Sequence, residues 1–387
     1  MRRCLSALGV AAVMVASLVW GTVPVDAARP ERFASGVPEP ANLAFDSRGR
    51  LWVASGGHLP RASNGVWLVR RAGARPVQVV RGLFSALGLT WRGGRLYVAH
   101  VVPSGGGGSG YVGRVTSFIG FDGRAFARSR VVLDGLPVGR HRLGSIVAGP
   151  GRRLYLGVGS RYDDRGTGER LSATVVSFRP GHRGIRVEAT GLRNPYGLAF
   201  LPGTSKLLIS EHGRDDLGLR WPPEELNLVD VAGPAPDFGF PDCFGQGGSA
   251  CRETRRALVR LAAHAAPGAI AVAASSSTRA TAFVPQFGSS FDAHPTGGDI
   301  VAMALTHRAG RWHARTRRFA RGLGRQNPLG AAIGPDGALY VSLWSRGRVV
   351  RFDLRTQQPK HATPPTAQPT LIARLLAWVV DRITGRR

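Results

Sequence analysis

Leu51-Trp-Val53 is the first of six copies of a short apolar motif, and this repeat decides the fold. The other copies are Leu96-Tyr-Val98, Leu154-Tyr-Leu156, Leu207-Leu-Ile209, Ala282-Phe-Val284 and Leu339-Tyr-Val341. Short apolar runs bounded by turn residues are typical of buried strands. Most copies follow another apolar run and a turn, as in Leu43-Ala-Phe-Asp-Ser-Arg-Gly-Arg50, which indicates a β-hairpin.

Further strands are predicted after each copy. A third alternating segment comes next, at 66–70, 114–119, 174–178, 226–230, 299–305 and 348–354. A fourth follows in most copies and ends in glycine and leucine, at Gly82-Leu83, Gly135-Leu136, Gly191-Leu192 and Gly322-Leu323. The fifth unit is expected to end near Arg260-Leu261, where the glycine is missing. Four strands per unit, repeated radially, are propeller blades, so the sequence predicts an all-β, six-bladed β-propeller over residues 31–355.

The sixth unit lacks a fourth strand of its own, because it ends after residue 354. Near the N-terminus, Arg32-Phe-Ala-Ser-Gly36-Val37 carries the missing fourth-strand ending. We therefore expect the N-terminal strand to complete the last blade. Such closure removes the exposed sheet edges that favour aggregation.

Residues 1–27 have the features of a secretory signal peptide. Met1-Arg2-Arg3 is followed by an apolar run from Leu5 to about Val23, and small residues precede a predicted cut after Ala27. The sequence thus predicts export to an extracellular, periplasmic or cell-envelope location. An uncleaved membrane anchor is the alternative, because the run is long for a signal.

The C-terminal residues read as a linker and a helix. Residues 356–370 are rich in Pro, Thr and Gln, and residues 371–387 place apolar side chains at 371/372, 375/376, 379/380 and 383 on one helical face. This amphipathic helix is expected either to dock on the propeller or to rest on a membrane surface.

Two cysteines remain after the predicted signal, which contains Cys4. Cys243 and Cys251 are eight positions apart, and an exported chain favours a disulfide between them. No His/Cys pair lies nearby at the spacing that a zinc site requires.

The formal net charge is +28 and comes almost wholly from arginine, since Lys206 and Lys360 are the only lysines. A basic field attracts nucleic acid, anionic surface polymers or an acidic cofactor. No helix-turn-helix, zinc-finger or aromatic RNA-binding motif accompanies the charge, so we expect no nucleic-acid partner. A peripheral membrane or cell-wall contact, through the basic surface and the C-terminal helix, is the expectation that remains.

Segments that lead from one blade to the next deliver side chains to one mouth of a propeller's channel. Here they are 38–42, 84–87, 137–143, 193–196 and 324–329. Polar residues in these segments would converge on one axial pocket. His141, Arg193 and Asn194 are the best placed of them.

Several runs resemble the glucose/sorbosone dehydrogenases, the soluble sugar dehydrogenases that use pyrroloquinoline quinone (PQQ). They are Gly191-Leu-Arg193-Asn194-Pro195-Tyr-Gly197, His141-Arg-Leu-Gly144-Ser-Ile-Val-Ala-Gly149-Pro150, Ser210-Glu211-His212-Gly213-Arg-Asp215-Asp216, Pro222-Pro-Glu224-Glu-Leu-Asn227 and Asp237-Phe-Gly-Phe-Pro241. The runs occur in the family's order and span most of residues 31–355. The resemblance implies a six-bladed propeller that oxidises a small-molecule sugar by passing a hydride to PQQ.

Roles for individual residues follow from the same resemblance. His141 would be the general base for the sugar hydroxyl, and Arg193 would neutralise charge on the quinone oxygen. Asn194, Arg325 and Asn327 would join Arg193 in binding the cofactor. Main-chain carbonyls at Gly213 and Arg214 would bind a Ca²⁺ that bridges to the quinone.

The sequence also departs from the glucose-oxidising members of that family. Gly159-Ser160 stands where they have Gly-Asp, and no lysine lies near residues 283–290. Their paired arginines before the last blade's Gly-Pro-Asp are represented by Arg325 alone, displaced, with Asn327 nearby. A catalytically silent propeller that binds a cell-wall glycan or a protein is therefore an alternative. A calcium-dependent lactonase is another, with Glu39 and Asn42 as its obvious ligands.

Overall fold

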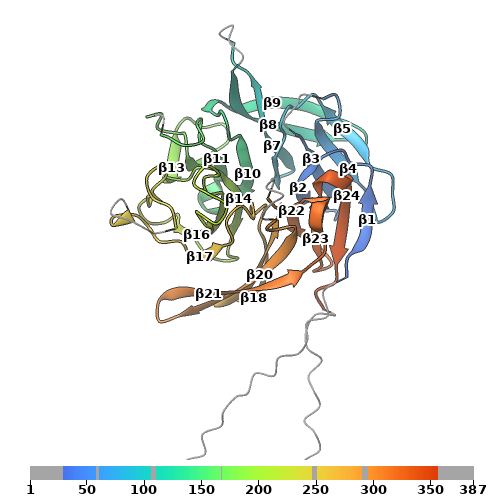
Figure 1. The fold of residues 1–387 in the computed structure, drawn as a ribbon. Coiled ribbons are helices and arrows are strands. Elements are labelled where there is room, and N and C mark those ends of the chain that lie inside the picture. The colour runs from blue at the N-terminus through green and yellow to red at the C-terminus, as the bar shows by residue number, and fades with distance from the viewer. Residues whose placement is uncertain are drawn as a thin grey trace, which may run out of the picture. The chain divides into compact units, whose positions relative to one another are not determined.

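The computed structural model describes residues 29–57, 61–105, 110–166, 168–245, 251–289 and 295–355. Six four-stranded antiparallel sheets form the blades of a propeller (Figure 1). Neighbouring innermost strands contact one another. The described residues otherwise contain turns and short 3₁₀ segments, among them Pro150–Arg152, Gly324–Gln326 and Trp344–Arg346. The predicted fold class is confirmed.

Each blade runs from an innermost to an outermost strand in chain order. Blade 1 is β2 (Pro40–Phe45), β3 (Leu51–Ser55), β4 (Gly65–Val69) and β5 (Val77–Arg81). Blade 2 is β6 (Gly88–Arg92), β7 (Arg95–Pro103), β8 (Tyr111–Phe121) and β9 (Phe126–Pro137). Blade 3 is β10 (Leu143–Ala148), β11 (Leu154–Val158), β12 (Thr174–Phe178) and β13 (Ile185–Ala189).

The second half of the chain repeats this order. Blade 4 is β14 (Pro195–Phe200), β15 (Lys206–Glu211), β16 (Glu224–Asp230) and β17 (Val259–Leu261). Blade 5 is β18 (Ala271–Ser276), β19 (Arg279–Gln286), β20 (Asp299–Arg308) and β21 (Arg311–Ala320). Blade 6 is β22 (Pro328–Ile333), β23 (Leu339–Leu343) and β24 (Arg348–Phe352), completed by β1 (Glu31–Ser35).

The N-terminal strand closes the ring, as the sequence predicts. β1 pairs antiparallel with β24, with Glu31 opposite Arg351 and Ser35 opposite Arg348. Phe33 packs edge-on against Tyr340 of β23, with the ring centroids 4.9 Å apart. This pairing joins residues far apart in the sequence and supplies the fourth strand that blade 6 lacks.

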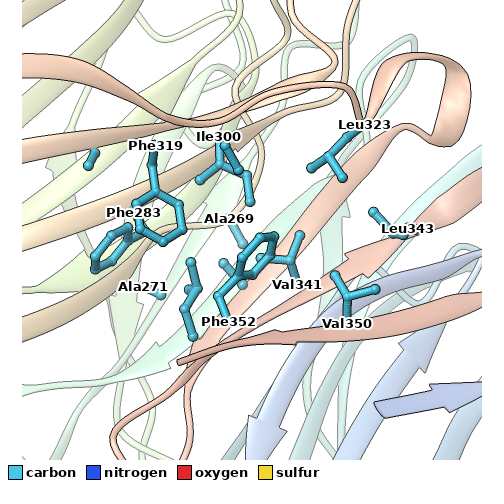
Figure 2. Packing of buried hydrophobic residues seen from close by; sticks show 14 residues of the cluster. Ala269, Ala271, Phe283, Ile300, Phe319, Leu323, Val341, Leu343, Val350 and Phe352 are labelled. Atoms are coloured by element: carbon cyan, nitrogen blue, oxygen red, sulfur yellow. The ribbon is translucent and has the colours of Figure 1, made fainter. Parts of the chain in front are cut away.

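The six repeated apolar motifs are the second strands of the blades, and all five residues of β3, β11 and β23 are buried. Their side chains have no solvent face because adjacent blades cover both sides. Figure 2 shows one such layer, where Phe283 and Phe319 of blade 5 pack against Val341 and Phe352 of blade 6. The Phe319 and Phe352 rings lie 5.5 Å apart between centroids. The hydrophobic core is therefore divided into layers between blades.

One strand belongs to a different blade from the one predicted. Arg260 and Leu261 lie in β17, which pairs with β16 and completes blade 4. Blade 5 instead ends in β21, just before Gly322. The assignment of the Arg260-Leu261 segment to the fifth unit was wrong, because a three-residue strand without the glycine carries little local signal.

Cys243 and Cys251 form the predicted disulfide. The predicted signal (1–27), linker (356–370) and amphipathic helix (371–387) lie outside the described residues. Within the described ranges, no helix has the length and apolarity needed to cross a membrane.

Candidate functional site

Two cavities open where the innermost strands begin, and they share His141, His212, Ala266 and Phe287 as lining residues. The first, here the polar cavity, has a volume of about 290 Å³ and is also lined by Arg193, Asp215, Glu224, His264, Gly288, Ser289 and Asn327. The second, here the apolar cavity, has a volume of about 260 Å³ and is walled by Leu87, Leu143, Tyr196, Leu329 and Trp344, with Arg140, Arg142 and Asn194 among its polar groups. The structure thus brings His141, Arg193, Asn194 and Asn327 together.

A larger open hollow of about 1080 Å³ lies elsewhere, at the outer strands of blades 4 and 5. Lys206, Asp230 and Trp312 are among its lining residues, and none of the predicted site residues is. Convergence of buried polar groups, which marks a ligand site, is found at the channel mouth instead.

Arg193 is the central polar residue of the site, and its side chain is only 3% exposed. Its Nε donates to the Asp163 carbonyl (2.9 Å), and Nη1 donates to the carbonyls of His212 (3.4 Å) and Gly213 (2.5 Å). Its Nη2 donates to Asp163 Oδ1 (2.6 Å) and Asp215 Oδ2 (3.1 Å). A guanidinium group has five N–H donors, so every donor of Arg193 meets a protein acceptor.

His141 lies immediately before β10 and pairs with Asp163 on the irregular segment between β11 and β12. The distance from His141 Nε2 to Asp163 Oδ1 is 3.0 Å. Burial lowers the pKa of His141, and the hydrogen bond to Asp163 only partly opposes this. The hydrogen bond from His141, with Arg193 adding to it, holds the pKa of Asp163 well below its usual range. His141 is therefore neutral and Asp163 ionised at neutral pH.

A second histidine–aspartate pair lies on the other side of Arg193. His264 Nδ1 is 3.2 Å from Asp215 Oδ1, and His264 Nε2 is 2.8 Å from the Gly218 carbonyl oxygen. Both neighbours are acceptors, so the ring donates to both only in its imidazolium form. The side chain of Asp215 is 52% exposed. Arg193 thus bridges two histidine–aspartate pairs, one built on blade 3 and the other on the loops of blade 4.

Asn194 and His212 hold each other in place. Asn194 Nδ2 donates to His212 Nδ1 (2.8 Å), and His212 Nε2 donates to the Pro267 carbonyl (2.8 Å). Burial lowers the pKa of His212 to about 4, so the ring is neutral and Nδ1 is free to accept. The ring stacks on Tyr196 with the centroids 5.8 Å apart. Both ring nitrogens of His212 already have hydrogen-bond partners in the protein. His212 therefore shapes the site and has no nitrogen left to act as a base.

Glu224, at the start of β16, ties two loops of the site together. Its carboxyl oxygens accept hydrogen bonds from the Gly213 amide (2.7 Å) and the Ala266 amide (3.2 Å). Burial raises the pKa of Glu224 to about 8. A largely protonated Glu224 adds little negative charge to the polar cavity at neutral pH.

The other residues predicted to bind the cofactor or calcium either already bond to protein groups or lie outside the cavities. Asn327 lines the polar cavity, but its Nδ2 donates to the Phe287 carbonyl (3.0 Å) and its Oδ1 accepts from Ser345. Arg325 is exposed and is not among the described residues that line either cavity. The Gly213 carbonyl accepts Arg193 Nη1, and the Arg214 side chain pairs with Asp216.

Asp163 and His264 are functional candidates that sequence reasoning missed, and Asp215 was noted only as part of the acidic loop in the family resemblance. His264 lies on the segment that leads into blade 5, which was not recognised because no Gly-Leu ending precedes it. Asp163 follows Ser160, the position where glucose-oxidising relatives carry aspartate, by three residues. No local periodicity marks a residue on such an irregular segment.

No protein-family model matches the sequence. The chain is 29% identical over 94 residues to an uncharacterised protein of Borreliella burgdorferi, a match that spans 24% of each chain. The match is too short to transfer any function of that protein to this chain.

Solved structures resemble most of the described chain. They include a Trichoderma reesei carbohydrate-active enzyme of family AA12 (TM-score 0.70, 18% identity, 86% of this chain and 97% of that one). The holo form of the PQQ domain of Coprinopsis cinerea pyranose dehydrogenase has a TM-score of 0.67 and 18% identity, covering 84% and 94%. The apo form of the soluble aldose sugar dehydrogenase of Escherichia coli has a TM-score of 0.59 and 15% identity, covering 84% and 99%. At these identities the likeness shows a common fold.

Proposed function

We propose that this chain is an exported sugar dehydrogenase of the glucose/sorbosone type, which uses PQQ as hydride acceptor and His141 as base. Three structures of the same fold are of sugar-oxidising or carbohydrate-active proteins, which supports the general kind of activity. The observation that carries the proposal is the chain of contacts His141–Asp163–Arg193, in which His141 lines both cavities and Arg193 lines the polar one.

His141 is arranged as a base. Its Nε2 faces the Asp163 carboxylate and therefore carries the ring proton, which leaves Nδ1 as the acceptor nitrogen. Because burial lowers the pKa of His141, the neutral form that accepts a proton dominates at neutral pH. Asp163 fixes the ring and stabilises the imidazolium that forms when a sugar hydroxyl loses its proton.

The hydrogen-bond donors of the site are of the type that binds the carboxylates of PQQ. PQQ carries carboxylates, and the Arg193 guanidinium already pairs with a carboxylate, that of Asp215, among the residues that line the polar cavity. Arg193, Asn194 and Asn327 would hold the cofactor, with Arg325 more distant. When bound, the quinone supplies the acceptor for the hydride. The apolar cavity, with Tyr196 among its walls, would hold the sugar.

Calcium does not fit at Gly213 in this arrangement. The Gly213 carbonyl accepts a hydrogen bond from the positively charged Arg193, which would repel a second cation. No cluster of three or more His, Cys, Asp or Glu side chains suited to a metal occurs among the described residues. No step of the proposed reaction is routed through calcium.

Export is proposed on two grounds. Residues 1–27 have the pattern of a secretory signal, and the Cys243–Cys251 disulfide is typical of oxidising compartments. A net charge of +28 supports contact with an anionic cell wall or membrane surface.

A catalytically silent binding propeller is the second candidate, and one observation favours it. All five N–H donors of Arg193 meet protein acceptors, and the Asn194 and Asn327 amides donate to protein groups as well. A site of this kind is complete without a cofactor.

Titration of the purified mature chain with PQQ, with and without Ca²⁺, separates the two candidates. The dehydrogenase proposal predicts saturable binding, read by the absorbance of the quinone. Absence of binding in both conditions would leave the silent propeller as the better account.

A further inference from the structure

Asp215 lines the polar cavity and contacts two buried side chains there. One carboxylate oxygen accepts Arg193 Nη2 at 3.1 Å, and the other lies 3.2 Å from His264 Nδ1. The two donors come from segments that precede the innermost strands of blades 4 and 5. Together they hold a single carboxylate in a two-point contact, the geometry that favours carboxylate recognition.

The contact is asymmetric, because its donors are fixed and its acceptor is not. The side chains of Arg193 and His264 are 3% and 4% exposed, whereas that of Asp215 is 52% exposed. Residues 215–221, which follow β15, are all exposed. Asp215 can therefore turn out into solvent, whereas Arg193 and His264 cannot leave.

Asp163, the other carboxylate on Arg193, is held more firmly. Its side chain meets both His141 Nε2 and Arg193 Nη2, and its backbone carbonyl accepts Arg193 Nε. Displacement of the Asp163 side chain would remove the hydrogen-bond partner of the buried His141 Nε2 as well as one acceptor of Arg193 Nη2, which is costly for buried groups. A competing anion would thus displace Asp215 and leave Asp163 in place.

We propose that Arg193 and His264 form a carboxylate-binding subsite, and that Asp215 is a displaceable internal carboxylate that fills it when no ligand is bound. The inference rests on the proposed function for the source of the ligand, which is either a carboxylate of the quinone or that of a sugar acid. In both cases Asp215 competes with the ligand, so the chain binds carboxylates more weakly than its donors allow.

The alternative role for Asp215 is a clamp. His264 also binds the Gly218 carbonyl, so the Asp215–His264 contact could serve only to hold residues 215–218 against the propeller. The two roles predict opposite effects of removing the carboxylate. A clamp loses affinity when it is broken, whereas a competitor, when removed, raises the affinity for ligand.

The test compares dissociation constants of the wild type, Asp215→Asn and Asp215→Ala. PQQ binding is read by absorbance, and D-glucuronate and D-glucose binding by calorimetry. Asp216→Asn is the matched control, because it removes the same charge one residue away. Asp216 is exposed, pairs with Arg214 and lines neither cavity. We expect both Asp215 variants to bind at least one carboxylate probe roughly fivefold more tightly, in keeping with the modest strength of a half-exposed ion pair. Glucose binding and the Asp216→Asn variant should stay within about twofold of wild type.

Each outcome bears on the subsite separately from the enzyme proposal. Tighter PQQ binding assigns the displacing carboxylate to the cofactor, and tighter glucuronate binding alone assigns it to the substrate and counts against the quinone. If neither Asp215 variant binds either probe more tightly, the subsite is overturned. If the Asp215 variants have a lower melting temperature and no gain in affinity, Asp215 is a clamp, and the proposed subsite is overturned in that case too.

Discussion

His141 Nε2 lies 3.0 Å from Asp163 Oδ1, and this pair joins the predicted base to the arginine at the centre of the site. The same carboxylate oxygen, Asp163 Oδ1, accepts hydrogen bonds from His141 Nε2 and from Arg193 Nη2. The position of the histidine ring is therefore coupled to the most deeply buried charge of the channel mouth. This coupling explains how an irregular segment between β11 and β12 can hold a reactive group in a fixed orientation.

The pair predicts a pH dependence. Only the neutral ring of His141 accepts a proton, and burial lowers its pKa below the ordinary value of 6.5. We expect kcat/KM to be constant above about pH 6.5 and to fall on the acid side below it. Asp163 raises the pKa of His141, so Asp163→Asn should move the acid limb to lower pH and reduce the plateau. An acid limb that moves to higher pH in this variant would contradict the assigned pair.

Arg193 should affect both cofactor and rate. Arg193→Ala is expected to raise the dissociation constant of PQQ and to lower kcat, because the guanidinium would touch the cofactor in ground and transition states alike. Arg193→Lys is the matched control, since lysine keeps the charge but has three donors in place of five. It should bind PQQ better than Arg193→Ala and worse than wild type, as read by absorbance. Unchanged PQQ affinity in both variants would place the cofactor elsewhere.

The fold could be predicted from the sequence because its signal is repeated. Each second strand is an apolar run buried on both faces, so six copies of Leu51-Trp-Val53 and its relatives mark six blades independently of any one of them. The short β17 carries no such signal, and its assignment to a blade failed for that reason.

The site was predictable only in part. His141, Arg193 and Asn194 immediately precede innermost strands, so the blade repeat locates them. Asp163 and Asp215 lie on irregular segments, where spacing says nothing about which side chain turns inward. Their roles depend on contacts with Arg193 across 30 and 22 residues of sequence, which only the folded chain brings about.

Closure by β1 predicts a large effect of a small deletion. Removal of residues 28–37 would expose the edge of β24 and remove the contacts of Phe33, Ala34 and Val37, two of which are fully or almost fully buried. The melting temperature should fall by several degrees or more, because each lost buried apolar side chain costs about 1.5–3 kcal/mol. Removal of residues 28–30 alone, which leaves β1 intact, is the control and should have little effect. A melting temperature equal in the two deletions would count decisively against closure.

The most direct test of the proposed dehydrogenase is the rate of dye-linked sugar oxidation by the PQQ-loaded wild type and by His141→Ala, measured alongside the PQQ dissociation constant of each. A general base acts on the substrate proton and not on the cofactor. We therefore predict a loss of about 10²-fold or more in rate with nearly unchanged PQQ affinity. Equal rates for the two proteins, or no sugar oxidation by a wild-type chain that has bound PQQ, would contradict the account.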